Sequence, residues 1–152
     1  MPKPAAASSM PPALERRLKY AGPVLFSYGF RPFFLGGATW SVACIVLWIP
    51  QFFGDFVLRT AYSPLDWHIH EMLYGYVAAV VAGFLLTAIP NWTGRLPVCG
   101  HELAALAGLW LSGRLVILLS AQFGLVTAAL IDIAFLATLA AVAAREDRKS
   151  VV

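Results

Sequence analysis

Four long apolar runs separated by short polar segments dominate the chain. They cover residues 33–53, 67–90, 102–120 and 122–144. Each is close to the roughly 20 residues that a helix needs to cross a hydrocarbon core of about 30 Å. Irregular backbone cannot face lipid, so helices are expected throughout these runs. The pattern predicts an all-α, polytopic membrane protein with four transmembrane helices.

The composition excludes an ordinary soluble domain. Of 152 residues, 60% are hydrophobic and 12% are charged, and the mean hydropathy is +0.75. A soluble domain is about 45–50% apolar and about 25% charged. Two cysteines do not make a disulfide framework, and we expect Cys44, inside a run, and Cys99, in a loop, to be unpaired.

The segments outside the runs define the domain organisation. Residues 1–23 are rich in Pro, Ala and Ser and carry basic residues, which predicts a mobile basic tail. They do not resemble a signal peptide, because the basic region is long and no small-x-small site closes the first run. Residues 24–145 are predicted to form the transmembrane domain, with a C-terminal tail at 146–152. We expect Pro90 to end the second helix, and the short gap after residue 120 predicts a tight helical hairpin.

The basic residues predict the orientation, because Lys and Arg accumulate in cytoplasmic segments. With both termini cytoplasmic, nine basic residues lie on that side and only Arg59 lies outside. The nine are Lys3, Arg16, Arg17, Lys19, Arg31, Arg95, Arg145, Arg148 and Lys149. These residues flank apolar runs and form no aromatic-interleaved basic stripe, so nucleic acid is excluded as a partner and the lipid bilayer is expected.

Two histidines and a glutamate open the second run, in "WHIHEMLYGY". Imidazole is a common ligand of haem iron and copper, so His68, His70 and Glu71 are candidate metal ligands. A helix turns about 100° per residue, so His68 and His70 point almost oppositely and cannot easily share one ion unless the first turn unwinds. His68 and Glu71 share a face. The alternative is that all three simply lie in the polar headgroup zone.

Arg114 and Asp132 fall well inside apolar runs. An ionised group there costs about 2.5–3.5 kcal/mol, so each should face protein or pair. Counted from a turn near residues 120–121, their depths differ by about 7 Å at about 1.5 Å per residue, which an arginine can largely span. The two predict a structural ion pair, with a polar pathway or substrate contact as the alternative.

The sequence contains no glycine-rich phosphate loop, no zinc-type Cys/His spacing and no nucleophile with an obvious base. These absences favour a protein that is not an enzyme.

Three motifs, "SYGFRPFFLGGATW", "HEMLYGYVAAVVAGFLLTAIPNWTGR" and "LAGLWLSGR", together resemble the N-terminal third of the NnrS family over roughly residues 24–120. These are haem- and copper-containing membrane proteins of nitric oxide metabolism and nitrosative stress. The resemblance implies a multi-pass protein of the bacterial inner membrane that binds haem b, with copper as a second metal and nitric oxide as a ligand. His68 and His70 become the cofactor-binding candidates.

Family members have many more membrane helices than the four predicted here. The resemblance therefore implies a truncated or short member, whose missing helices would come from a longer protein, a partner subunit or a second copy. Two other functions stay open. One is a transport or channel subunit that uses Arg114 and Asp132, and the other is a non-catalytic fragment that assembles with a partner.

Overall fold

The computed structural model describes residues 20–93 and 97–148, and in this part of the chain all regular structure is helical. A single 3₁₀ turn, η1 (Val24–Ser27), precedes α2 (Phe30–Phe53). The second span joins α3 (Pro64–His70), a π-helix η2 (Glu71–Val77) and α4 (Ala78–Thr93). After it come α5 (His101–Leu118), the one-turn α6 (Ser120–Phe123) and α7 (Leu125–Arg148). Four of these stretches are long and apolar enough to cross a membrane, which confirms the predicted fold class.

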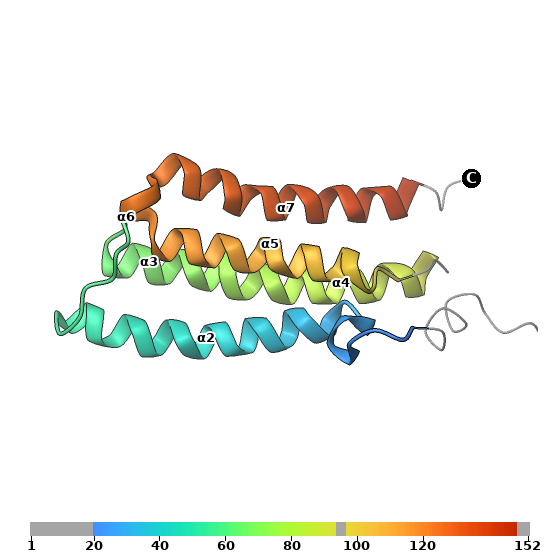
Figure 1. The fold of residues 1–152 in the computed structure, drawn as a ribbon, viewed down its shortest axis with the longest axis horizontal. Coiled ribbons are helices and arrows are strands. Elements are labelled where there is room, and N and C mark those ends of the chain that lie inside the picture. Colours follow the sequence, from blue (N-terminus) through green and yellow to red (C-terminus); the bar gives the residue numbers. More distant parts are fainter. Residues whose placement is uncertain (1–19, 94–96, 149–152) are drawn as a thin grey trace, which may run out of the picture.

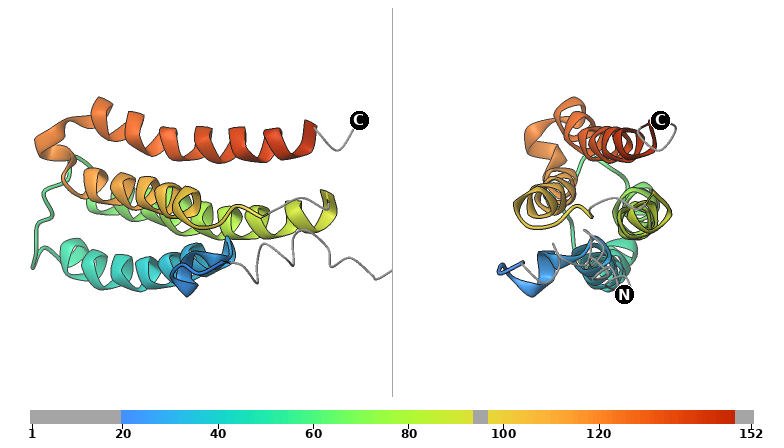
Figure 2. Two further views of the ribbon diagram at one scale, coloured as in Figure 1. Left: turned by 45° about the vertical axis from the view of Figure 1, so that its right-hand side comes forward. Right: turned by 90° about the vertical axis from the view of Figure 1, so that its right-hand side faces the viewer.

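The four spans lie side by side, alternating in direction (Figure 1). The start of α2 and the end of α7 lie at one end of the bundle, here called the terminal end, and residues 54–63 and α6 lie at the other, the loop end. α2 packs on η2 and α4, α4 packs on α7, and α7 packs on α5. Seen end-on, the spans surround a common centre (Figure 2). The cytoplasmic location of the terminal end stays a prediction. Most of the basic residues that support it lie in 1–19, 94–96 and 149–152, outside the described residues.

The second span begins at a capped turn and does not end where the sequence predicted. Ser63 accepts a hydrogen bond from the Asp66 backbone N–H at 3.2 Å, and Pro64 occupies the first turn, where its missing N–H is harmless. The prediction that Pro90 ends the helix is wrong, because α4 continues through Pro90 to Thr93. Membrane helices tolerate proline better than soluble ones, since neighbouring helices and hydroxyl side chains compensate the broken ladder.

A short corner at the loop end connects α5 to α7. Gly124 adopts a left-handed φ of +82°, so the last span begins at Leu125 and not at residue 122. Ser120 anchors this corner, because its Oγ accepts from the Ala61 backbone N–H at 2.9 Å and lies 3.1 Å from Thr60 Oγ1. The two connections at the loop end are therefore tied to each other.

The buried side chains form two apolar clusters, one toward each end of the bundle. The terminal-end cluster includes Phe33, Ala78, Leu86, Leu103, Trp110 and Phe135. The loop-end cluster consists of Cys44, Leu58, Trp67, Ile117 and Ala128. Trp40 packs against both clusters, so it marks the level at which they meet.

Candidate functional site

Three ionisable side chains are buried at the level where the two apolar clusters meet. Glu71 and Arg114 are completely buried, and Asp132 is 5% exposed. On its helix each lies between a residue of the loop-end cluster and one of the terminal-end cluster. The flanking residues are Trp67 and Ala78 around Glu71, Ile117 and Trp110 around Arg114, and Ala128 and Phe135 around Asp132. The structure thus contains a thin polar layer between two apolar ones.

Within this layer four side chains form a closed ring, here called the tetrad: His70, Glu71, Arg114 and Asp132. Arg114 donates from Nη1 to Glu71 Oε2 at 2.8 Å and from Nη2 to Asp132 Oδ1. His70 closes the ring on the other side. Its Nδ1 lies 3.3 Å from Glu71 Oε1, and its Nε2 lies 3.2 Å from Asp132 Oδ2. Each of the four carboxylate oxygens of Glu71 and Asp132 therefore contacts a nitrogen of either Arg114 or His70.

The first span contributes through an indole. Trp40 on α2 donates from Nε1 to Glu71 Oε2 at 2.7 Å. The tetrad comes from the second, third and fourth spans, so every membrane-length helix of the described chain supplies at least one group to this layer. The polar contacts therefore tie the whole bundle together at one depth.

The π-helix η2 shapes the second span at this level. Short π segments inside α-helices are rare and often occur at functional sites. In η2 the two buried residues are Glu71 and Gly75, four positions apart on one side of the wide turn. The carbonyl of Gly75 accepts a hydrogen bond from Trp110 Nε1 at 2.9 Å. The segment thus offers both a carboxylate and a backbone acceptor to the bundle interior.

Two glycines make room for the tetrad. A Cβ on Gly75 would lie 2.8 Å from Trp40 Nε1 and 3.0 Å from Arg114 Nη1. A Cβ on Gly113 would lie 2.9 Å from Asp132 Oδ1. Real Cβ atoms almost never approach so closely, so the absence of a side chain at both positions is a steric requirement of the site.

The two histidines of the motif have different surroundings. The His70 ring stacks on Tyr74 with centroids 4.8 Å apart and lies 5.4 Å from the Tyr62 ring. The His68 ring faces the other way and stacks on Trp48 of α2, with centroids 4.3 Å apart and planes at 19°. His68 Nδ1 is buried and has no hydrogen-bond partner among the described residues. The opposite orientations expected for residues two apart on a helix are observed here.

Among the sequence-predicted site residues, the structure brings together His70, Glu71, Arg114 and Asp132, and it places His68 apart from them. The depth argument for Arg114 and Asp132 anticipated their contact. Sequence reasoning missed the Glu71–Arg114 pair and Trp40. The Glu71–Arg114 pair had one signal in the sequence: the apolar runs contain a single arginine and more than one carboxylate. Nothing in the sequence marked Trp40.

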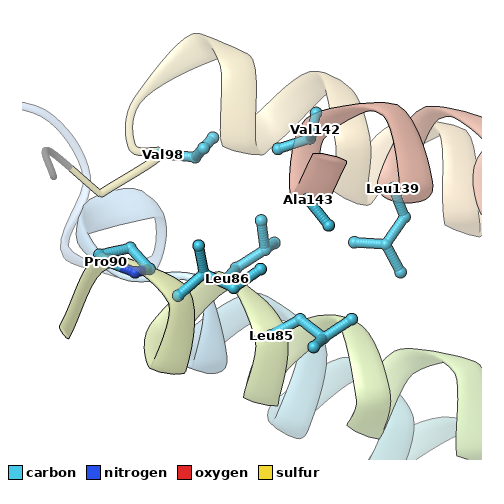
Figure 3. A pocket seen from close by; sticks show the side chains of 8 residues that line it. Leu85, Leu86, Pro90, Val98, Leu139, Val142 and Ala143 are labelled. Atoms are coloured by element: carbon cyan, nitrogen blue, oxygen red, sulfur yellow. The ribbon is translucent and has the colours of Figure 1, made fainter. Parts of the chain in front are cut away.

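Two spaces between the helices have no histidine among the described residues that line them. The gap in Figure 3, between α4, α7 and Val98, is apolar and only about 10 Å³ in volume. A larger groove of about 600 Å³ lies between α2 and α5 and is lined by Trp40 and Trp110. The described residues that line it include no histidine, cysteine, aspartate or glutamate. Neither space has an imidazole side chain in its described lining.

Comparison with protein families shows to which family the chain belongs. A family model described as NnrS protein matches residues 24–149, from η1 beyond the last described residue of α7. The chain belongs to the NnrS family. This confirms the resemblance seen in the three sequence motifs and extends it through the fourth span. No curated protein and no solved structure matches the chain.

NnrS proteins are generally associated with haem and copper, so the donor set must be compared with those metals. No group of three His, Cys, Asp or Glu side chains that could hold an ion occurs among the described residues. His68 is the histidine of this motif that contacts no carboxylate among the described residues, and its buried Nδ1 has no hydrogen-bond partner there. It could therefore serve as a ligand of haem iron, for which one imidazole suffices. His70 and Glu71 fit poorly, since their ring nitrogens and carboxylate oxygens already contact charged partners.

Proposed function

We propose that this NnrS-family chain is a haem-binding membrane protein of nitric oxide metabolism or nitrosative-stress tolerance, with His68 as the ligand of the iron. Family membership supports a nitric-oxide-related membrane protein. The observation that carries the assignment to His68 is its buried, unpartnered Nδ1. A haem held there would supply an iron centre able to bind nitric oxide.

Local packing supports this role for His68. Stacking on Trp48 holds the imidazole plane in one orientation, which would help it to hold a metal. The imidazole must bind iron as a neutral ring through a nitrogen lone pair. Because Nδ1 of His68 makes no hydrogen bond among the described residues, no protein group fixes which ring nitrogen carries the lone pair.

Further ligands would come from outside the described residues. Copper commonly takes two or more imidazole or sulfur ligands, and the described chain offers no group of three. We therefore propose that any further ligand of the iron, and any copper site, would involve further helices of a longer protein, a partner subunit or a second copy. The exposed apolar side chains of α2 and α7 face the bilayer or such helices.

The visible spectrum of the purified chain tests the proposal. We would express the full 152-residue chain with haem supplementation, purify it in detergent and compare wild type with His68→Ala. His101→Ala is the matched control, because His101 is exposed at the start of α5. The expected result is a Soret band in wild type and control, shifted by nitric oxide, and its loss in His68→Ala. A folded wild-type chain without a Soret band would defeat the proposal.

A further inference from the structure

We propose that the tetrad is an ion network that locks the membrane helices together and is not a metal site. Within the sequence His68-Ile69-His70-Glu71, only His68 then remains to contact a metal. The part that concerns His68 rests on the proposed function, whereas the role of the tetrad stands on its own geometry.

The first argument against a metal ion at the tetrad is the position of Arg114. Its guanidinium contacts both Glu71 and Asp132, so a fixed cation already occupies the space between the two carboxylates. Arginine stays protonated in proteins. A metal cation on the same carboxylates would lie a few ångströms from this positive charge, at a depth where water screens little. The chain itself thus supplies a positive charge that both carboxylates contact.

The contacts of His70 give the second argument. Each ring nitrogen faces a carboxylate oxygen, at 3.3 Å for Glu71 and 3.2 Å for Asp132. A carboxylate oxygen accepts hydrogen bonds and cannot donate them. A metal needs an imidazole nitrogen with a free lone pair. Both nitrogens of His70 are directed at acceptors, which suits a bridge between two carboxylates and not a ligand.

The membrane setting explains why such a lock is useful. Between helices in lipid the hydrophobic effect contributes little, so interhelical polar contacts and close packing hold a bundle together. The tetrad joins the second, third and fourth spans, and Trp40 adds the first. A buried charge that loses its partner is strongly unfavourable, so each helix is held to the register at which the ring closes.

The layers on either side indicate that the ring is closed off along the bundle axis. Toward the loop end Glu71, Arg114 and Asp132 are followed by Trp67, Ile117 and Ala128. Toward the terminal end they are followed by Ala78, Trp110 and Phe135. On each of these three helices the cluster residues that flank the tetrad are apolar on both sides, which favours the structural alternative over a polar pathway through Arg114 and Asp132.

Two isosteric variants separate the roles of the two histidines. For His68→Gln and His70→Gln we would measure the thermal midpoint in detergent and the haem and copper content per folded protein. His70→Gln is expected to lower the Tm by about 10 °C and to keep wild-type metal content. His68→Gln is expected to lose haem and to keep the Tm that wild-type protein has without haem, since bound haem itself stabilises the folded state. Folded His70→Gln protein that has lost its metal would overturn the proposal, as would an unchanged Tm.

A second variant keeps the test decisive if His70→Gln does not fold. The double variant Arg114→Gln with Asp132→Asn removes one charge of each sign, so it should be more stable than Arg114→Gln alone and keep wild-type metal content. Loss of metal from the folded double variant would place the metal at the tetrad. If wild-type protein binds neither haem nor copper, the proposed function fails, and the Tm series still decides whether the tetrad is a lock.

Discussion

Arg114 on α5 donates a hydrogen bond from Nη1 to Glu71 Oε2 on η2, at 2.8 Å, and both side chains are completely buried. The two residues are 43 positions apart in the sequence and lie on different spans. It also leaves the second guanidinium nitrogen for Asp132 on the last span. One arginine therefore holds two carboxylates from two different helices.

Arg114→Gln should destabilise the bundle by about 3–5 kcal/mol, because it leaves two buried carboxylates without their cation. Arg114→Lys should recover only part of this loss, since an ammonium lacks the planar fork that contacts both carboxylates. Denaturant unfolding in mixed micelles measures both. Arg59→Gln serves as the control, because Arg59 is exposed at the loop end and its substitution should cost little.

Gly75→Ala should cost about 1–3 kcal/mol, because the new methyl group would overlap Trp40 and Arg114. The matched control is Gly108→Ala on α5, where an added Cβ meets nothing within 4 Å. There the better helix propensity of alanine should leave the protein equally stable or stabilise it by up to about 1 kcal/mol. Equal effects at the two glycines would contradict the packing described for η2.

Trp40→Phe keeps the apolar ring but removes the N–H that contacts Glu71. A hydrogen bond to a charged group contributes about 1.5–3 kcal/mol, so the thermal midpoint should fall accordingly. Trp92→Phe is the comparison, because Trp92 is 73% exposed near the end of α4. If the two substitutions lower the midpoint to the same extent, the indole of Trp40 does not support the carboxylate.

A double-mutant cycle on Arg114→Gln and Asp132→Asn separates a structural bridge from a transport pathway. Residues in direct contact show coupling energies of about 0.5–3 kcal/mol. We expect the double variant to be more stable than the sum of the single effects indicates. Ion flux in proteoliposomes is measured on the same samples, and normal folding with lost flux would favour transport.

The orientation of the bundle can be tested by labelling single cysteines in intact cells. In a Cys99→Ser background, a cysteine at Asp55, which is exposed at the loop end, should react with an impermeant maleimide from outside. A cysteine at Ser150 should react only after lysis. The reverse pattern would overturn the predicted cytoplasmic location of both termini.

Much of the fold was accessible from local pattern. Runs of about 20 apolar residues predicted four spans because the bilayer imposes a length, and the structure contains four such helices. The end of the second span was not accessible, because Pro90 stops most helices in water and is tolerated here inside α4. The π-helix at Glu71–Val77 could not be predicted from the sequence either, since it depends on contacts made across the bundle.

Part of the candidate site could likewise be predicted from the sequence, and part could not. Glu71 was predicted as a candidate metal ligand or a headgroup-zone residue, so its need for a partner inside the bundle was not predicted. Sequence alone determined that Arg114 and Asp132 need partners, because an ionised group deep in an apolar span is costly. It also determined that His68 and His70 point apart, because helix geometry fixes the angle between them. Only the tertiary structure decided that Arg114 binds both carboxylates, that His70 closes the ring and that Trp40 joins it. These pairings depend on how each helix is rotated and shifted against its neighbours, which side-chain packing across the bundle sets and no single span encodes.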